Sequence, residues 1–488
     1  MKKITECYAR KERPIKVLQF GEGNFLRSFV DYMIDIANEK GLFDGSIAVV
    51  KPIAFGSLKQ FHAQDNLYTV CLRGKEEGKI VRENRVVTSI GKVLDAQENY
   101  EAFMALAAME ELTFVVSNTT EAGIVFDPSE DFSAKPPVTY PGKLTQFLYA
   151  RYAHFQGAKD KGLVILPVEL IENNGIKLKE CVLRLAEIWK LPQEFVGWIE
   201  ESNMFCSTLV DRIVTGYPRD EAQSYWEELG YEDKLLSVCE PFALWVIESP
   251  KDISALLPLD KAGLPVVFTR DQRPYRERKV RLLNGAHTAT ILNAYLSGRD
   301  IVGECMADED IRRFMTEAVF EEILPTVTLP REEVLAFAGS VFERFENPFI
   351  RHGLLSIALN SVSKWKSRIL PSLLDSLAQT GRLPKCLTFS FAALLAFYTC
   401  EKRADGTYAG VRPDGTDYPV QDDQGTLAFF AVNSGKAAGE YAQTAAANAA
   451  LWGRDLNLIP GLSEVVAKNL EAIRTVGPRA AMNQLLKE

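Results

Sequence analysis

Three polar residues in the second half of the chain have the types and spacing needed for a reversible hydride transfer. They are Lys279, Asn284 and His287. On an α-helix that turns about 100° per residue, Asn284 and His287 lie about 60° apart, and Lys279 falls within an arc of about 140°. A lysine whose pKa is lowered by partial burial can act as acid and base at a secondary alcohol. An amide and an imidazole can hold the oxygen while its charge changes.

The same spacing also has a plain structural interpretation. Lys279 then lies exposed at the start of a helix, Asn284 caps a helix, and His287 is a hydrogen-bonded histidine of the core. Three unrelated polar residues on one helix face are common, so spacing alone leaves both interpretations open.

A second candidate site lies near the N-terminus. The apolar run from Ile15 to Phe20 enters Gly21-Glu22-Gly23, and apolar residues at helical spacing follow. This order of strand, glycine turn and helix suits the pyrophosphate of NAD, because the second glycine lets phosphate approach the backbone N–H groups. Leu26 replaces the third glycine of the usual pattern, and a plain strand-to-helix turn also favours glycine. The candidate cofactor contacts are Phe20, Gly21, Glu22, Gly23, Asn24, Phe25 and Arg27.

The next expected strand, from Ser46 to Val50, ends in Lys51, where an NAD-binding strand usually ends in an acid. Lys51 either accommodates the 2′-phosphate of NADP or is a surface lysine without a role. Residue type does not decide between the two cofactors.

The elements around these residues indicate two architectures. Short β-rich apolar runs with helical segments between them predict a doubly wound parallel sheet over the first half. From about residue 276 the apolar spacing is mostly three and four, which predicts helices, interrupted by a loop or small hairpin over 403–417. We therefore expect an α/β Rossmann-like domain over residues 1–275 and an all-α domain over residues 276–488.

Composition excludes several classes of function. The chain has 56 Lys and Arg against 65 Asp and Glu, a net charge of −9, which argues against a nucleic-acid or anionic-membrane partner. The start shows no signal peptide, and the longest nearly apolar stretch, 387–399, is shorter than the ~20 residues of a membrane span. Eight scattered cysteines and four histidines indicate no disulfide framework and no structural metal. These features predict a cytoplasmic enzyme.

The order Lys279-x4-Asn284-x2-His287 resembles the signature of the mannitol dehydrogenase family, the polyol-specific long-chain dehydrogenases. The resemblance runs from the glycine turn through 210–213 to 344–348. It implies that Lys279 is the general acid and base, that Asn284 and His287 bind the reacting oxygen, and that no catalytic zinc takes part. It further implies a loop near the nicotinamide, which adds three candidate cofactor contacts: Asn118, Thr119 and Glu121.

Within the family, three segments resemble a branch that acts on keto-uronates: 20–27, 167–171 and 203–219. Members that act on mannitol carry an asparagine where this chain has Leu170, which argues against mannitol. The resemblance implies NADH-linked reduction of D-tagaturonate to D-altronate, a step of bacterial galacturonate breakdown, and NAD despite the missing acid. The alternatives are fructuronate reduction, mannitol or arabinitol dehydrogenation, and a non-catalytic dinucleotide sensor.

A sugar acid as substrate brings a carboxylate, which a site must meet with a cation or N–H donors. The candidates are Lys143, Lys364 and Arg368, of which Lys364 matches a family position; each also fits a plain surface charge. His352 either lines the same site or caps a helix. Nothing in the sequence predicts the oligomeric state.

Overall fold

The computed structural model describes residues 1–119 and 122–487, which form two compact units. Unit 1 contains Met1–Gly74 and Lys79–Gln272, and unit 2 contains Lys75–Gly78 and Arg273–Glu488. The domain limits 1–275 and 276–488 stay a prediction.

Unit 1 is built on a six-stranded parallel sheet in the order β6-β3-β2-β7-β8-β9. Its strands are β2 (Ile15–Phe20), β3 (Ser46–Lys51), β6 (Ile90–Asp95), β7 (Phe114–Ser117), β8 (Val164–Pro167) and β9 (Met204–Phe205). The strand order reverses between β2 and β7, and α/β sheets bind ligands at the carboxyl ends of the strands beside such a point. The predicted Rossmann-like fold is confirmed.

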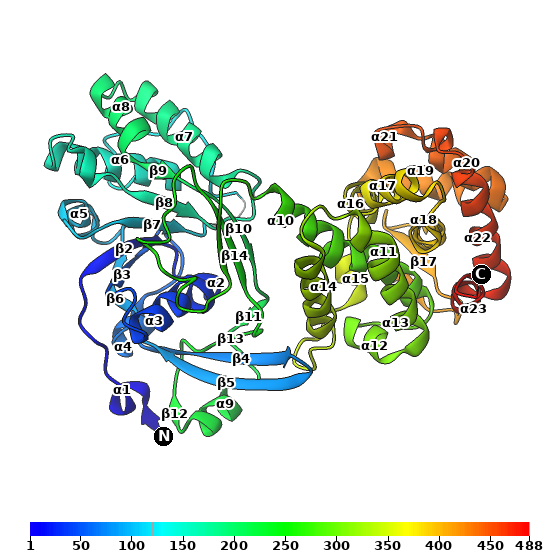
Figure 1. The fold of residues 1–488 in the computed structure, drawn as a ribbon, viewed down its shortest axis with the longest axis horizontal. Coiled ribbons are helices and arrows are strands. Elements are labelled where there is room, and N and C mark those ends of the chain that lie inside the picture. The colour runs from blue at the N-terminus through cyan, green and yellow to red at the C-terminus, as the bar shows by residue number, and fades with distance from the viewer. Residues whose placement is uncertain (120–121, 488) are drawn as a thin grey trace. The chain divides into compact units, whose positions relative to one another are not determined.

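Both faces of this sheet are buried, because alternate residues of each strand enter different cores. In β2, Val17 packs in one core with Phe29 and Met33, whereas Leu18 packs in the other with Phe147. Figure 1 shows helices α6, α7 and α8 over one face and α3 over the other. The α- and π-helices of unit 1 are α1 (Ile4–Cys7), α2 (Asn24–Leu26), the π-helical η1 (Arg27–Asp31), α3 (Tyr32–Glu39), α4 (Lys59–Ala63), α5 (Tyr100–Ala105), α6 (Tyr140–His154), α7 (Asn174–Ile188), α8 (Gln193–Ser202) and α9 (Ala222–Leu229).

Smaller sheets extend unit 1 beyond the predicted strands. One has the order β10-β14-β15, another β11-β13-β4-β5, and a third pairs β1 with β12. Their strands are β1 (Lys2–Lys3), β4 (Tyr68–Glu76), β5 (Lys79–Val87), β10 (Ser207–Asp211), β11 (Val214–Gly216), β12 (Tyr231–Glu232), β13 (Ser237–Cys239), β14 (Leu244–Glu248) and β15 (Val266–Thr269). They fold against the α3 face, where residues such as Trp245 and Val70 join its core.

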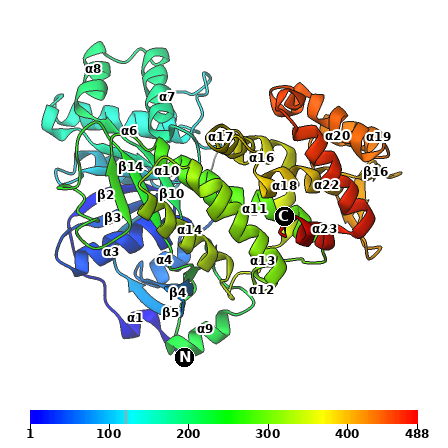
Figure 2. The same ribbon diagram turned by 45° about the vertical axis from the view of Figure 1, so that its right-hand side comes forward.

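Unit 2 is mainly helical, as predicted (Figure 2). Helix α11 is buried at every position, which explains why its sequence shows no polar face. The helices are α10 (Arg273–Arg278), η4 (Lys279–Asn284), α11 (Gly285–Leu296), α12 (Val302–Ala307), α13 (Glu309–Thr316), η5 (Glu317–Ile323), α14 (Arg331–Phe345), α15 (Leu354–Ala358), α16 (Ser361–Arg368), α17 (Leu370–Thr380), α18 (Lys385–Phe397), α19 (Gln424–Asn433), α20 (Ala438–Ala447), α21 (Ala449–Trp452), α22 (Leu462–Val476) and α23 (Pro478–Leu485).

A small antiparallel sheet interrupts these helices. It consists of β16 (Cys400–Lys402), β17 (Tyr408–Val411) and β18 (Asp417–Pro419). The turn-rich segment 403–417, expected as a loop or small hairpin, supplies the turns and central strand of this sheet. The predicted helical fold of unit 2 is therefore confirmed, with one small β insertion at the expected interruption.

The apolar stretch 387–399 falls largely in α18, a helix of 13 residues. Among the described residues, no helix is both long and apolar enough to span a bilayer.

Candidate functional site

The glycine turn connects β2 with α2 at the point where the strand order of unit 1 reverses. Gly21 has a φ of +121°, and its N–H donates to the carbonyl of Val50 on β3 at 3.1 Å. A Cβ at this position would lie 3.0 Å from the carbonyl oxygen of Asn118 and 3.1 Å from Leu26 Cδ1. Only glycine suits this conformation and this close approach of two chain segments.

Gly23 has a different role, because it is exposed and precedes the helix. It is the N-cap residue of α2, and a Cβ built on it would meet nothing within 4 Å. The helix continues through η1 into α3, and the first N–H groups of a helix have no carbonyl partner within it. Backbone donors beside an open approach fit the pyrophosphate of a dinucleotide.

Two of the predicted cofactor contacts, Phe20 and Arg27, have buried side chains that support this turn. Phe20 is fully buried and packs against Phe103 and Tyr140, so its side chain belongs to the core. The buried guanidinium of Arg27 donates to the carbonyl of Glu22 at 3.2 Å and to Asn24 Oδ1 at 2.5 Å. Arg27 therefore fixes the backbone of the glycine turn.

The other predicted cofactor contacts follow β7. Asn118 and Thr119 are half-buried, and the N–H of Asn118 donates to the carbonyl of Phe20 at 3.1 Å, which joins this loop to the glycine turn. Glu121 lies outside the described residues. Phe25 lies elsewhere, in α2, where it stacks on Phe29 with ring centroids 5.1 Å apart.

Glu169, which the sequence analysis did not select, organises the same loop. Its buried carboxylate accepts hydrogen bonds from Ser117 Oγ at 3.1 Å and from both N–H and Oγ1 of Thr119 at 3.0 Å. Burial raises its pKa, and these hydrogen bonds oppose that rise. An acid two residues after the end of the apolar strand β8 was the sequence signal for this role.

Lys51 is not the surface lysine that one interpretation required. It is 2 % exposed, and its ammonium lies 2.8 Å from Asp95 Oδ2 on the adjacent strand β6. It also donates to the carbonyls of Ile53 at 2.9 Å and Phe55 at 3.2 Å. The buried pair forms because β3 and β6 are parallel and Lys51 is opposite Asp95 in register.

In unit 2, the segment η4 (Lys279–Asn284) is a π-helical turn between α10 and α11. Hydrogen bonds of a π-turn join residues i and i+5, so Lys279 and Asn284 occupy the same helix face one turn apart. A regular α-helix would have separated them by about 140°. The prediction assumed a regular α-helix and an angle of about 140° between Lys279 and Asn284. The π-turn makes that angle smaller and brings both residues to one side of the helix.

Neighbouring helices hold this turn in place. The guanidinium of Arg281 lies 2.6 Å from Asp375 Oδ2 and 2.8 Å from Glu277 Oε1, and it donates to Thr326 Oγ1 at 2.8 Å. Gly285 allows close packing at the next turn, since a Cβ there would lie 3.4 Å from Ile323 Cδ1. Such multiple anchors suit a segment that must present side chains at fixed positions.

His287 is not a hydrogen-bonded core histidine of the kind that the plain interpretation assumed. It is 8 % exposed, and its buried Nδ1 has no hydrogen-bond partner in the described part of the chain. Its ring stacks on Phe345 and meets His352 edge-on, with ring centroids 5.6 Å apart. An unpaired buried ring nitrogen is costly, so it marks a position where a ligand oxygen can bind.

Positive side chains surround this imidazole. Burial lowers the pKa of His287 well below 6.5, and the charges of four neighbours lower it further: His352, Arg368, Arg344 and Lys364. Arg344 is buried, whereas Lys364 and Arg368 on α16 are half-buried. A cluster of cations around an unpaired imidazole fits an anionic ligand.

The two cations on α16 contact nearby oxygen atoms. Lys364 donates to the carbonyl of Ile357 at 2.7 Å, and Arg368 reaches Thr288 Oγ1 at 3.4 Å. Lys143 belongs to unit 1, where it is 1 % exposed and donates to the carbonyl of Val138 at 2.6 Å. Burial lowers the pKa of Lys143 to about 8. Its ammonium anchors the start of α6, so we assign no ligand contact to it.

Comparison with known families covers most of the chain. The mannitol dehydrogenase Rossmann domain matches residues 15–261, and the mannitol dehydrogenase C-terminal domain matches residues 271–474. The chain belongs to the mannitol dehydrogenase family. The family match spans both the glycine turn of unit 1 and the Lys279–His287 segment of unit 2.

Several family members resemble the chain over almost their whole length. Proteins named altronate oxidoreductase from Yersinia enterocolitica and Klebsiella pneumoniae are each 46 % identical, and one from Escherichia coli is 45 % identical, with 97 % of both chains covered in each comparison. These are relatives at the level of the full chain.

Two solved family structures share the fold at low identity. Mannitol 2-dehydrogenase of Pseudomonas fluorescens, in a ternary complex with NAD and D-mannitol, is 23 % identical with a TM-score of 0.68, covering 99 % of this chain and 96 % of that one. A substrate-free D-sorbitol dehydrogenase is 22 % identical with a TM-score of 0.76, covering 96 % and 95 %. They support the architecture of this member of the mannitol dehydrogenase family.

Proposed function

We propose that this chain is an NADH-dependent oxidoreductase that reduces D-tagaturonate to D-altronate, reversibly and at a single secondary alcohol carbon. The observation that carries the proposal is the full-length similarity to altronate oxidoreductases, at 45–46 % identity over 97 % of the chain. The Lys279, Asn284 and His287 set on a π-turn and the following helix supports the same chemistry.

The nicotinamide cofactor, when bound, supplies the hydride. The chain supplies the remaining functions from its own residues. The glycine turn at Gly21 and Gly23 fits the pyrophosphate. Lys279 delivers the proton to the reacting oxygen, while Asn284 and His287 hold that oxygen as negative charge develops on it.

The surroundings of His287 suit a neutral hydrogen-bond donor. Since burial and neighbouring cations lower its pKa, the imidazole stays uncharged at neutral pH. A neutral ring polarises the carbonyl without giving up its proton, which leaves proton transfer to Lys279. Separate residues therefore perform oxygen binding and proton transfer.

We assign the carboxylate of the sugar acid to Lys364 and Arg368 on α16, and we assign His352, whose ring meets that of His287, to the same site. The support is electrostatic: both cations on α16 depress the pKa of His287, so they act on the space that the substrate oxygen shares. Arginine binds carboxylates in a bidentate geometry that lysine cannot match. Arg368 is therefore the stronger candidate.

The substrate is a small sugar acid, and we place the reaction in the cytoplasm. All eight cysteines are free in the structure, at positions too scattered for a stabilising disulfide framework.

Leu170, in the position where mannitol-specific members carry asparagine, is 64 % exposed and offers no hydrogen bond to a polyol.

The direct test follows NADH consumption by the purified protein with tagaturonate, fructuronate and fructose in parallel, and with NADPH as the second cofactor. We expect rapid consumption with tagaturonate and NADH. Activity confined to fructose or fructuronate would reassign the substrate within the family. Absence of turnover with all three, with intact NADH binding, would favour a dinucleotide sensor.

A further inference from the structure

The carboxyl end of β3 lies beside the glycine turn, since β3 neighbours β2 and Gly21 donates to Val50. In sheets of this order the residue at that strand end meets the adenosine ribose, an acid for NAD and a basic residue for NADP. Lys51 occupies this position. By residue type alone, it would indicate NADP.

The contacts of Lys51 remove that interpretation. An ammonium group carries three N–H donors, and three acceptors surround it: Asp95 Oδ2 at 2.8 Å, the carbonyl of Ile53 at 2.9 Å and the carbonyl of Phe55 at 3.2 Å. Its charge is paired with Asp95, whose side chain is 9 % exposed. Burial opposes ionisation of Asp95, but the hydrogen bond from Lys51 keeps its pKa below the usual value.

The same contacts shape the loop that follows β3. The ammonium of Lys51 binds two carbonyls of this loop, those of Ile53 and Phe55. The side chains of these two residues are 54 % and 81 % exposed. Gly56 brings the loop against the glycine turn, since a Cβ there would lie 3.6 Å from Glu22 Oε1 and 4.0 Å from Lys51 Cδ. The position near the ribose therefore holds two carboxylates, Glu22 and Asp95, around one lysine whose donors are engaged.

We propose that the buried ion pair between Lys51 and Asp95 determines the preference for NADH over NADPH. Asp95 and the loop carbonyls withhold the ammonium from a 2′-phosphate, and the carboxylate of Glu22 accepts the ribose hydroxyls and repels that phosphate. Asp95, on β6, is thus a positioning residue that holds Lys51 away from the cofactor. Glu22 then takes the part of the acid that β3 lacks. The inference rests on the proposed use of a nicotinamide dinucleotide.

The test is a binding titration of NADH and NADPH, followed by nicotinamide fluorescence without any sugar acid. Asp95→Asn removes the negative partner, so the charge of Lys51 becomes available to a phosphate. We expect NADPH to bind about tenfold more tightly relative to NADH than in the unmodified protein. Glu201→Gln is the matched control, because it breaks an exposed ion pair with Lys159 and should leave the ratio unchanged.

Two further variants keep the inference testable if Asp95→Asn does not fold. Glu22→Gln should weaken NADH binding and weaken NADPH binding less, since it also removes the negative charge that repels the 2′-phosphate. Lys51→Met should not lower the affinity for NADPH specifically, because Lys51 does not contact the phosphate. A selective loss of NADPH binding in Lys51→Met, or an unchanged ratio in a folded Asp95→Asn, would overturn the inference.

These outcomes are separable from failure of the proposed function. If the unmodified protein binds dinucleotides but reduces no sugar acid, the proposed reaction fails while the specificity test still applies. If it binds neither dinucleotide, both the proposed function and this inference are wrong.

Discussion

The imidazole of His287 stacks on the ring of Phe345, with the ring centroids 4.1 Å apart and the planes tilted by 33°. The aromatic ring covers one face of the imidazole and excludes water from it, while His352 meets it edge-on. This contact fixes the orientation of the ring before a ligand arrives. An oxygen-binding residue that is already oriented loses little freedom when the ligand binds.

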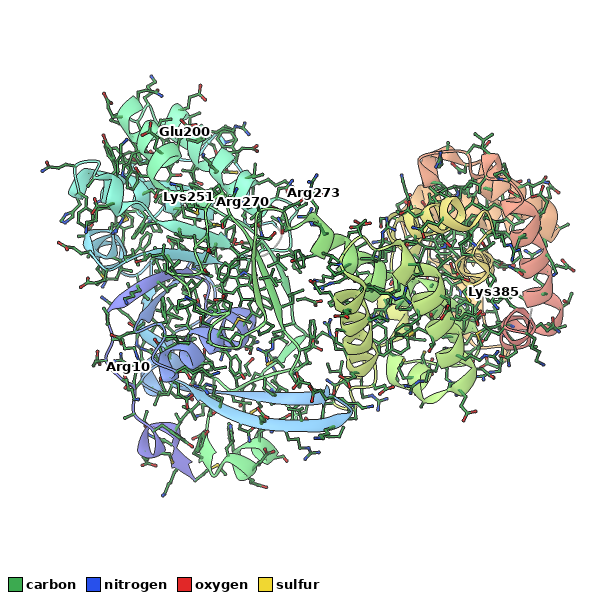
Figure 3. All side chains as sticks on the ribbon, in the orientation of Figure 1. Arg10, Glu200, Lys251, Arg270, Arg273 and Lys385 are labelled. Carbon is green, nitrogen blue, oxygen red and sulfur yellow. The ribbon has the colours of Figure 1, made fainter. Side chains whose placement is uncertain are left out.

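Loss of the predicted proton donor should stop the reaction without affecting cofactor binding. We expect Lys279→Ala to lower kcat by at least about 10²-fold, the usual contribution of a general acid. The Kd for NADH should change little, because the glycine turn is in unit 1. Lys385, labelled in Figure 3, lies at the start of α18 and pairs with Glu317, so Lys385→Ala is a matched control in the same unit. Unimpaired turnover in Lys279→Ala would contradict the assigned role.

The cations near His287 should distinguish a sugar acid from a neutral sugar. Replacing Arg368 with methionine removes the charged hydrogen-bond donor and keeps an unbranched apolar side chain. We expect KM for tagaturonate to rise by about 10- to 100-fold, from the usual strength of a charged hydrogen bond. A neutral keto sugar should be used no worse than before. Lys364→Met provides the comparison, and an equal loss with charged and neutral substrates would argue against a carboxylate contact.

The two glycines of the turn should respond differently to substitution. Gly21→Ala places a Cβ 3.0 Å from a backbone carbonyl at a φ of +121°, so it should lower the free energy of unfolding by about 1–3 kcal/mol. Gly23→Val should lower stability less than Gly21→Ala, because its Cβ would meet nothing within 4 Å and only the preference for glycine at an N-cap is lost. It should instead raise the Kd for NADH steeply by blocking the pyrophosphate. Thermal unfolding and NADH titration of both variants separate the two effects.

The buried His287 should make stability depend on pH. Its pKa in the folded protein is well below 6.5, mainly through burial, so the unfolded chain binds more protons just below pH 6.5. The free energy of unfolding should therefore fall as the pH decreases from about 6.5, at up to about 1.4 kcal/mol per pH unit from this one group.

Urea unfolding between pH 7.5 and pH 5 measures this dependence. His287→Asn should reduce the slope below pH 6.5, whereas His154→Asn, at an exposed position in the last turn of α6, serves as the control. Equal slopes for His287→Asn and the unmodified protein would show that this imidazole is not held neutral.

Much of unit 1 was predictable because its central strands are buried on both faces. The apolar run 15–20 coincides with β2, and Gly21 and Gly23 follow it as the motif requires. The strands of the smaller sheets were missed because many of them are short or partly exposed. In β5 (Lys79–Val87), most residues face solvent, so no apolar run distinguishes the strand from a loop.

The environment of single polar residues was less predictable. The sequence left Lys51 open between a contact to NADP and a surface position, but Asp95, which is distant in sequence, pairs with it across two parallel strands. Glu169 was missed for the same reason, since its partners Ser117 and Thr119 lie on another strand and loop. Local pattern identifies a strand end, whereas pairing between strand ends depends on sheet order.

The π-turn at 279–284 makes the placement of Lys279 depend on chain length as well as on residue type. A π-turn holds one residue more than the α-helical turn it replaces. Deleting a single residue such as Val280 would restore a regular helix in which the lysine and the asparagine stand four positions apart, about 40° from each other. With all residues kept, a regular helix would instead place Lys279 about 140° from Asn284. The shared direction of these side chains therefore depends on how many residues the turn holds, which a comparison of residue identities alone does not record.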